Sequence, residues 1–148
     1  MPKVNRILVA VDFSAVSANA LRHATALARQ LGAVLEVFNA LPLTEIDLPE
    51  NASAEHENEV IQSALEKRKI KLSRFVNKNV ANLSDVEESV GLGRPVELVN
   101  DAAKHKHVDL IVIGTHGRTG LKHLLVGSVA ESVLRQADIP VLCIRSPV

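Results

Sequence analysis

Short runs of apolar residues recur along the chain and alternate with longer, amphipathic segments. The first run, residues 7–11, reads Ile-Leu-Val-Ala-Val and contains no polar position. A run without alternation is typical of a strand buried on both faces, as strands of parallel sheets are. The run at residues 86–91 is less regular, because Glu87, Glu88 and Ser89 interrupt it. We predict strands at residues 7–11, 34–38, 86–91, 108–113 and 140–144.

The segments between these runs carry apolar residues at helical spacing. In the first segment Ala20, Ala24 and Leu27 fall on one face, and Gly32 can end the helix. The third segment begins at Pro95, which is well suited to the first turn of a helix. We predict helices at residues 15–31, 53–80, 95–106 and 129–136.

The second predicted helix follows a segment of different character. Residues 41–51 contain two prolines and no clear period, which predicts a mobile loop whose Leu and Ile side chains could cover a site. The helix itself carries basic residues that lie largely off its apolar stripe. They could form a nucleic-acid patch, but a solvated face is favoured, because acidic residues on the same helix offset them. The basic residues are Lys67, Arg68, Lys69, Lys71, Arg74 and Lys78.

Strand and helix alternate from one end of the sequence to the other. This order predicts a single α/β domain over residues 1–148, with a parallel sheet and helices on both of its faces. Ligands of such sheets bind beyond the carboxyl ends of the strands, where the strand order reverses. Two of these ends carry suitable residues: Asp12 after the first strand and Gly114 after the fourth. If the two strands are neighbours, a binding site lies between them.

Composition narrows the range of partners. The 148 residues include 17 basic and 17 acidic ones, so no global charge favours nucleic acid or an acidic membrane. Aromatic residues make up 2% and are all Phe, which argues against a base-stacking surface. The single Cys143 cannot form an internal disulfide and is expected to be an inert core residue. With no signal peptide and no apolar run of roughly 20 residues, we expect a cytoplasmic protein.

The segment between Gly114 and Ser128 is the strongest candidate for a ligand site. It follows an apolar strand and leads into a predicted helix that begins at Val129. Glycines allow a ligand to approach the backbone, and the free N–H groups of a helix's first turn attract phosphate. Both ends of the site have a structural alternative. Asp12 could simply cap the first helix, and Ser128 with Glu131 fits a capping box.

The glycine spacing excludes the common nucleotide motifs. The segment matches neither the Walker A motif nor Gly-x-Gly-x-x-Gly. It reads Gly-x-x-Gly, nine residues, then Gly-Ser, at Gly114, Gly117, Gly127 and Ser128. In these residues the chain resembles the ATP-binding branch of the universal stress protein family. The resemblance extends to the opening Ile-Leu-Val-Ala-Val-Asp and the closing Ile-Pro-Val-Leu-Cys-Ile-Arg, and so covers essentially the whole chain.

The resemblance implies a Rossmann-like, adenine nucleotide α-hydrolase-like fold. Its five-stranded parallel sheet has the order 3-2-1-4-5, and the protein is a homodimer that pairs through the last strand. Adenine would lie near the ends of the first two strands, at Val11, Asp12 and Ala40. Ribose and phosphates would follow Ile113, Gly114, Gly117, Gly127, Ser128 and Val129, accompanied by Mg²⁺ or Mn²⁺ whose protein ligands are unknown. Arg118 could add charge near the phosphates or could be an exposed loop residue.

The sequence offers less support for catalysis. It contains no nucleophile elbow, no Cys-His pairing and no metal cluster, and no carboxylate beyond Asp12 is obviously placed to activate water. We therefore predict an ATP-binding regulatory protein of the stress response, without assigned catalytic residues. One alternative is a slow ATPase or phosphotransferase. Another is a dimeric interaction module in which nucleotide binding is incidental.

Overall fold

A parallel five-stranded sheet forms the centre of the molecule. The computed structural model describes residues 2–115 and 127–145. Within these ranges the strands follow the order β3-β2-β1-β4-β5, and each pairs in parallel with its neighbours. The predicted fold class and strand order are confirmed. The strands are β1 (Arg6–Ala10), β2 (Val34–Leu41), β3 (Val86–Leu92), β4 (Leu110–Gly114) and β5 (Val141–Ile144).

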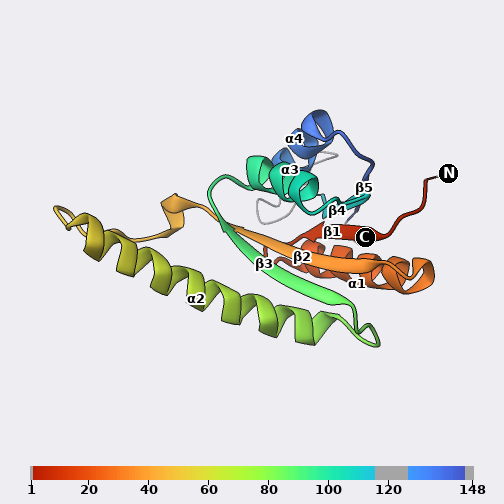
Figure 1. Cartoon of the computed structure of the whole chain (residues 1–148), viewed down its shortest axis with the longest axis horizontal. Coiled ribbons are helices and arrows are strands. Elements are labelled where there is room, and N and C mark those ends of the chain that lie inside the picture. The colour runs from red at the N-terminus through yellow and green to blue at the C-terminus, as the bar shows by residue number, and fades with distance from the viewer. Residues whose placement is uncertain (1, 116–126, 146–148) are drawn as a thin grey trace.

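Helices cover both faces of the sheet (Figure 1). They are α1 (Ala15–Leu31), α2 (Ala54–Asn79), α3 (Pro95–His105) and α4 (Ser128–Gln136), with a short 3-10 helix η1 (Leu43–Glu45). On β1, Ile7 and Val9 belong to the core beneath α1 and α2, whereas Leu8 belongs to the core beneath α3 and α4. Because successive side chains of a strand point to opposite faces, β1 has to be apolar from Ile7 onward, where both faces are covered.

The ends of the helices agree with the local signals. Ser14 caps α1, where its Oγ accepts a hydrogen bond from the Ser17 N–H at 3.1 Å. Gly32 ends the same helix in the left-handed region, with φ 64°. Pro95 lies in the first turn of α3. Among the described residues, no helix is both long and apolar enough to cross a membrane.

The bounds of all five strands differ from the sequence-based ones by one to three residues, and two strands illustrate the reason. β2 continues to Leu41 instead of ending at Phe38, because Asn39, Ala40 and Leu41 still pair with β3. β3 is a strand in spite of its glutamates. It lies at one edge of the described sheet, where Glu87 and Glu88 remain exposed to water. Pairing between strands, which no local pattern reveals, decided both boundaries.

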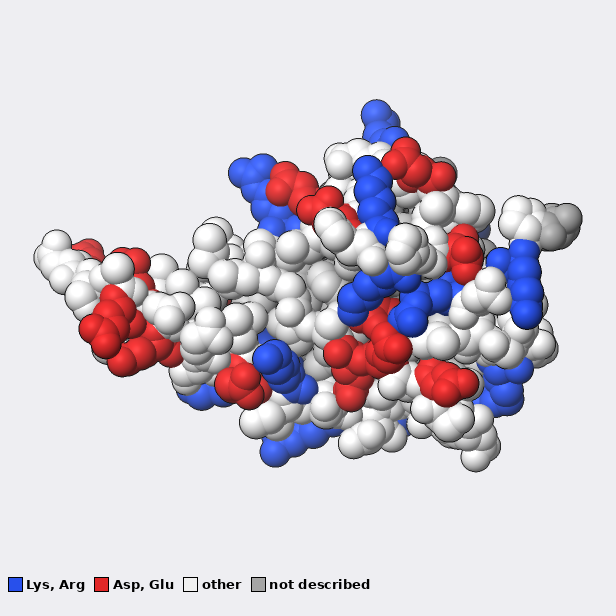
Figure 2. Space-filling model, in the orientation of Figure 1, with Lys and Arg blue, Asp and Glu red and all other residues white. Residues whose placement is uncertain are grey.

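The N-terminal half of α2 projects beyond the sheet together with residues 42–53 (Figure 1). The buried residues of α2, Leu72 and Val76, both lie in its C-terminal half. The projecting end carries most of the acidic residues of this region, and Figure 2 shows their carboxylates gathered there. The segment predicted as a loop, residues 41–51, lies alongside this half of α2 and contains η1.

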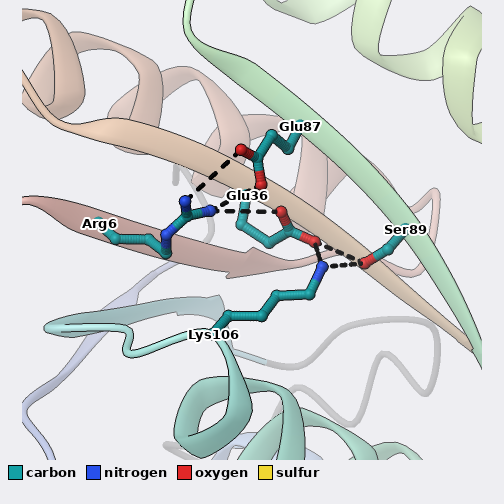
Figure 3. Close-up of polar contacts among 5 residues, drawn as sticks. All are labelled: Arg6, Glu36, Glu87, Ser89 and Lys106. Carbon is teal, nitrogen blue, oxygen red and sulfur yellow. Dashed lines mark hydrogen bonds and ion pairs between the residues drawn. The ribbon is translucent and has the colours of Figure 1, made fainter.

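A charged cluster surrounds the buried Glu36 on the α3 side of the sheet (Figure 3). Glu36 of β2 is fully buried, and its Oε1 accepts hydrogen bonds from Ser89 Oγ at 2.6 Å and from Lys106 Nζ. Its Oε2 lies 3.9 Å from Nη1 of Arg6, which also donates to Glu87 Oε2 at 2.7 Å. A buried carboxylate is tolerated only when such partners compensate its lost hydration. The cluster thereby ties β1, β2 and β3 to the end of α3.

Candidate functional site

A cavity opens at the carboxyl ends of β1, β2 and β4, next to the first turns of α3 and α4. Its volume is about 220 Å³. Since a water molecule needs only about 10–15 Å³ of such volume, the cavity has room for a small organic ligand. Eight predicted site residues line it: Val11, Asp12, Ala40, Ile113, Gly114, Gly127, Ser128 and Val129. The other two, Gly117 and Arg118, lie outside the described residues.

The sheet topology creates this cavity. β1 lies between β2 and β4, and Ala10 of β1 pairs with Phe38 on one side and Ile113 on the other. The chain leaves β1 toward α1 on one face, whereas α4, which follows β4, covers the opposite face. The two connections diverge and leave a crevice at the carboxyl edge. Residues about a hundred positions apart in the sequence thus share one site.

Asp12 braces the turn between β1 and α1. Its Oδ1 accepts a hydrogen bond from the Ser14 N–H at 3.0 Å, and its own N–H donates to Ser17 Oγ at 3.3 Å. The side-chain cap of α1 is Ser14, so the simple capping role considered for Asp12 is wrong. Phe13 between them has φ 68°, and its ring packs edge-on against Phe75 at 5.4 Å between centroids. This turn places Asp12 in the wall of the cavity.

The first turn of α4 forms the opposite wall. Gly127 is the N-cap residue and Ser128 is the first residue of the helix, so Ser128 does not form the capping box considered from the sequence. Glu131 pairs instead with Arg135, at 2.7 Å between Oε1 and Nη2. Ser128, Val129 and Ala130 all line the cavity. The first N–H groups of a helix have no partner within the helix, which makes this wall suited to an anion.

The lining residues that were not predicted include three joined by hydrogen bonds, Asn39, Glu45 and Arg68. Asn39, only 2% exposed, donates from Nδ2 to the Val11 carbonyl at 2.8 Å and accepts at Oδ1 from Arg68 Nη1 at 3.1 Å. Arg68 also donates from Nη2 to Glu45 Oε2 at 2.5 Å. All three line the cavity.

The solvated position predicted for Arg68 is wrong, because only 14% of its side chain is exposed. Arg68 lies one turn before the buried Leu72, so it shares the inward side of α2. That spacing was the available signal.

Outside this site the sequence offered few candidates for chemistry. In residues 2–115 and 127–145, no group of three or more His, Cys, Asp or Glu side chains could hold a metal ion. Cys143 is half-buried on β5, and burial raises the pKa of its thiol. A raised pKa keeps the thiol protonated, which agrees with the inert role expected for it.

The fold and the site define an α/β protein with a ligand crevice at the point where the strand order reverses. The sequence profile of the universal stress protein family matches residues 3–145. A universal stress protein of Bacillus subtilis is 33% identical over 150 residues, covering 95% of this chain and 99% of that protein. The chain belongs to the universal stress protein family.

Solved structures agree with this assignment. The structure of the hypothetical protein MJ0577 superimposes with a TM-score of 0.84 at 28% identity, over 99% of both chains. A universal stress protein of that designation comes from Methanocaldococcus jannaschii. A universal stress protein of Archaeoglobus fulgidus in complex with dAMP has a TM-score of 0.59 at 25% identity, over 97% of this chain and 99% of that one.

Proposed function

We propose that this chain is an ATP-binding regulatory protein of the stress response that acts in the cytoplasm. One observation carries the proposal: residues selected from the two ends of the sequence line a single cavity, with the N-terminus of α4 in its wall. The Archaeoglobus relative solved with dAMP supports an adenine nucleotide as the ligand. The spaced glycines support ATP in particular.

In this proposal the nucleotide lies across the ends of the central strands. The base occupies the end formed by Val11, Asp12 and Ala40, and the ribose lies near Ile113 and Gly114. The phosphates lie at Gly127, Ser128 and Val129, where the first-turn N–H groups of α4 can donate to them. Gly117 and Arg118 belong to the proposed phosphate end as well.

Gly127 supports this arrangement. Its φ of −67° is accessible to any residue, so its own backbone conformation does not require glycine. Glycine is a common N-cap residue, and at this position it also lines the cavity. In the proposed arrangement the missing side chain leaves space for the phosphates.

A metal ion fits the site only as a companion of the phosphates. The carboxylates lining the cavity are those of Asp12 and Glu45, and Glu45 is bound to Arg68. Mg²⁺ typically takes one or two carboxylates and completes its shell with phosphate oxygens and water. We propose that Mg²⁺ or Mn²⁺ arrives with ATP and is held mainly by phosphate oxygens and water.

The side chains that line the cavity favour binding of ATP over its hydrolysis. Efficient phosphoryl transfer requires a positioned nucleophile and strong charge stabilisation. Asp12 already accepts a hydrogen bond from the Ser14 N–H, and it is proposed to lie at the base end, away from the γ-phosphate. Slow ATPase or phosphotransferase activity is the alternative. Turnover that follows the purified protein and disappears in Asp12→Ala or Ser128→Ala would support it.

We also propose that the protein is a homodimer that pairs through β5. β5 is at the edge of the described sheet, and Leu142 within it is 40% exposed. An edge strand has unpaired backbone groups that a second copy can satisfy. A constitutive dimer with incidental nucleotide binding is the alternative function, and sedimentation with and without ATP separates the two.

Thermal unfolding with and without Mg-ATP tests the proposed function. A ligand at 100 times its Kd stabilises the native state by about 2.7 kcal/mol. For a chain of this size that corresponds to a rise in Tm of roughly 5–10 °C. Gly127→Val should abolish the rise. Gly32→Ala strains the left-handed backbone at the end of α1, but Gly32 does not line the cavity, so this variant should keep the rise.

Absence of any shift at millimolar ATP in the folded wild-type protein would contradict the proposal. Mass spectrometry of small molecules released from protein purified without added nucleotide would identify the bound species directly.

A further inference from the structure

The cavity ends, on the side away from α4, at a partly buried ion pair. Arg68 Nη2 and Glu45 Oε2 lie 2.5 Å apart, with 14% and 35% of the two side chains exposed. Arg68 is fixed from a second direction by Asn39, whose amide is itself bound to the Val11 carbonyl. The guanidinium therefore rests on the ends of β1 and β2 and holds Glu45 of η1 against α2.

A second hollow lies directly beyond this pair. Its volume is about 380 Å³, and it is formed between η1 with the residues after it and the projecting half of α2. Glu45 lines both spaces. Of two consecutive residues of α2, Arg68 lines the cavity and Lys67 lines the hollow. The Glu45–Arg68 pair is thus the partition between the cavity and the hollow. Figure 1 shows the two segments that carry it, side by side beyond the sheet.

In the orientation proposed above, the base of the nucleotide lies next to this partition. The role of the Glu45–Arg68 pair therefore rests on the proposed function. β2 and β4 flank β1 and lie two strand spacings apart, roughly 9.5 Å. With the phosphates at α4, the sugar lies near β4 and the base extends toward β2. The edge of adenine that bears the 6-amino group is opposite the edge that joins the sugar. That amino edge faces Asn39, Glu45 and Arg68.

We propose that Glu45 and Arg68 determine ligand specificity at the base end. The partition admits adenine nucleotides with an unsubstituted 6-amino group and excludes those that carry a bulky substituent there, because the substituent would collide with the ion pair. Exclusion by a built-in clash is a general source of specificity. Shortening Glu45 opens the cavity into the hollow. Because Asp47, Glu59 and Lys67 also line the hollow, the opened site accepts neutral or cationic substituents.

Binding of two probes tests this inference. Calorimetry measures the Kd of two probes, Mg-ATP and Mg-N6-benzyl-ATP. The proteins are the wild type, Glu45→Ala and the matched control Glu59→Ala. Glu59 is suited as the control because it lines only the hollow. The wild type and the control should bind the benzyl analogue at least about tenfold more weakly than ATP. Glu45→Ala should reduce this ratio to about threefold or less.

A second variant removes the other side chain of the ion pair, that of Arg68. Arg68→Ala should also reduce the ratio of the two Kd values, in protein whose thermal unfolding shows a folded state. Equal affinities of the wild type for both probes would overturn the inference while leaving ATP binding intact. A ratio that stays at its wild-type value in folded Glu45→Ala would overturn it too. A wild type that binds neither probe would overturn the proposed function itself.

Discussion

Val16 of α1 packs directly against Gly114 at the end of β4. A Cβ atom added to Gly114 would lie 2.7 Å from Val16 Cγ1 and 3.1 Å from the Val16 carbonyl oxygen. Real side chains do not tolerate the first of these distances. The first turn of α1 can therefore approach the sheet, and hence the cavity, only because β4 ends in glycine.

Gly114→Ala is expected to destabilise the protein by about 1–3 kcal/mol, because either α1 or β4 must shift. Val16→Ala removes the closer of the two contacting atoms. The double variant should therefore be more stable than the sum of the single changes predicts, by more than about 0.5 kcal/mol. Denaturant-induced unfolding of the four proteins measures this coupling. Strict additivity would show that the contact does not constrain the fold.

Glu36→Gln is expected to destabilise the protein by about 2–3 kcal/mol. The amide keeps the size of the side chain but leaves Lys106 and Arg6 without their shared buried charge. Removing one partner of a fully buried ion pair costs about 3–5 kcal/mol, and the effect should be smaller here. The reason is that 35% of Lys106 and 25% of Arg6 is exposed, so water can solvate both.

The control for this change is Glu88→Gln, at an exposed glutamate next to Ser89 on the same edge strand β3. Its Oε2 accepts a hydrogen bond from Ser73 Oγ at 3.3 Å, which the amide oxygen of glutamine can also accept. The effect of this substitution should stay within about 0.5 kcal/mol. Equal effects of the two substitutions in urea unfolding would contradict the stabilising role of the buried cluster.

Stability should depend on pH through Glu87. The hydrogen bond from Arg6 holds the pKa of this carboxyl below its ordinary value of 4.5. Because the folded-state pKa is lowered, the stabilisation is present above the unfolded-state pKa and is lost as the pH falls through the folded-state pKa. Glu87→Gln should therefore be less stable than the wild type at pH 7, and the difference should disappear in strong acid.

The size of this difference is limited by solvent. With 52% of the Glu87 side chain exposed, water screens the pair, and we expect at most about 1 kcal/mol. Unfolding curves of both proteins from pH 7 down to acid measure it. A difference that stays constant with pH would rule out the charged pair as its cause.

Leu142→Glu should convert the proposed homodimer into monomers. The substitution places a charge on the exposed side of β5, at the centre of the expected strand pairing. Sedimentation velocity measures the outcome. Ile70→Glu is the matched control, since Ile70 is 53% exposed on α2, a helix on another edge of the molecule. Loss of the dimer in both variants, or in neither, would argue against pairing through β5.

Much of the fold could be predicted from the sequence because the signals were local. Buried strands such as residues 7–11 must be apolar on both faces, and helix ends at Ser14, Gly32 and Pro95 depend on neighbouring backbone groups only. The spaced glycines led to the correct family and, through it, to the strand order. Eight residues chosen on these grounds line one cavity.

Only the tertiary structure revealed which residues form the end of that cavity away from α4. β2 extends to Leu41 because β3 pairs with it, and this extension places Asn39 beside Val11 and Arg68. On a predicted helix Arg68 is one of several basic residues. Its spacing to Leu72 indicates the inward side of the helix, but only packing shows that it reaches Asn39 and Glu45. The sequence fixes what each segment can form by itself, whereas contacts between distant segments depend on how helices and strands pack. Glu45 and Arg68 meet for that reason, 23 positions apart in the chain.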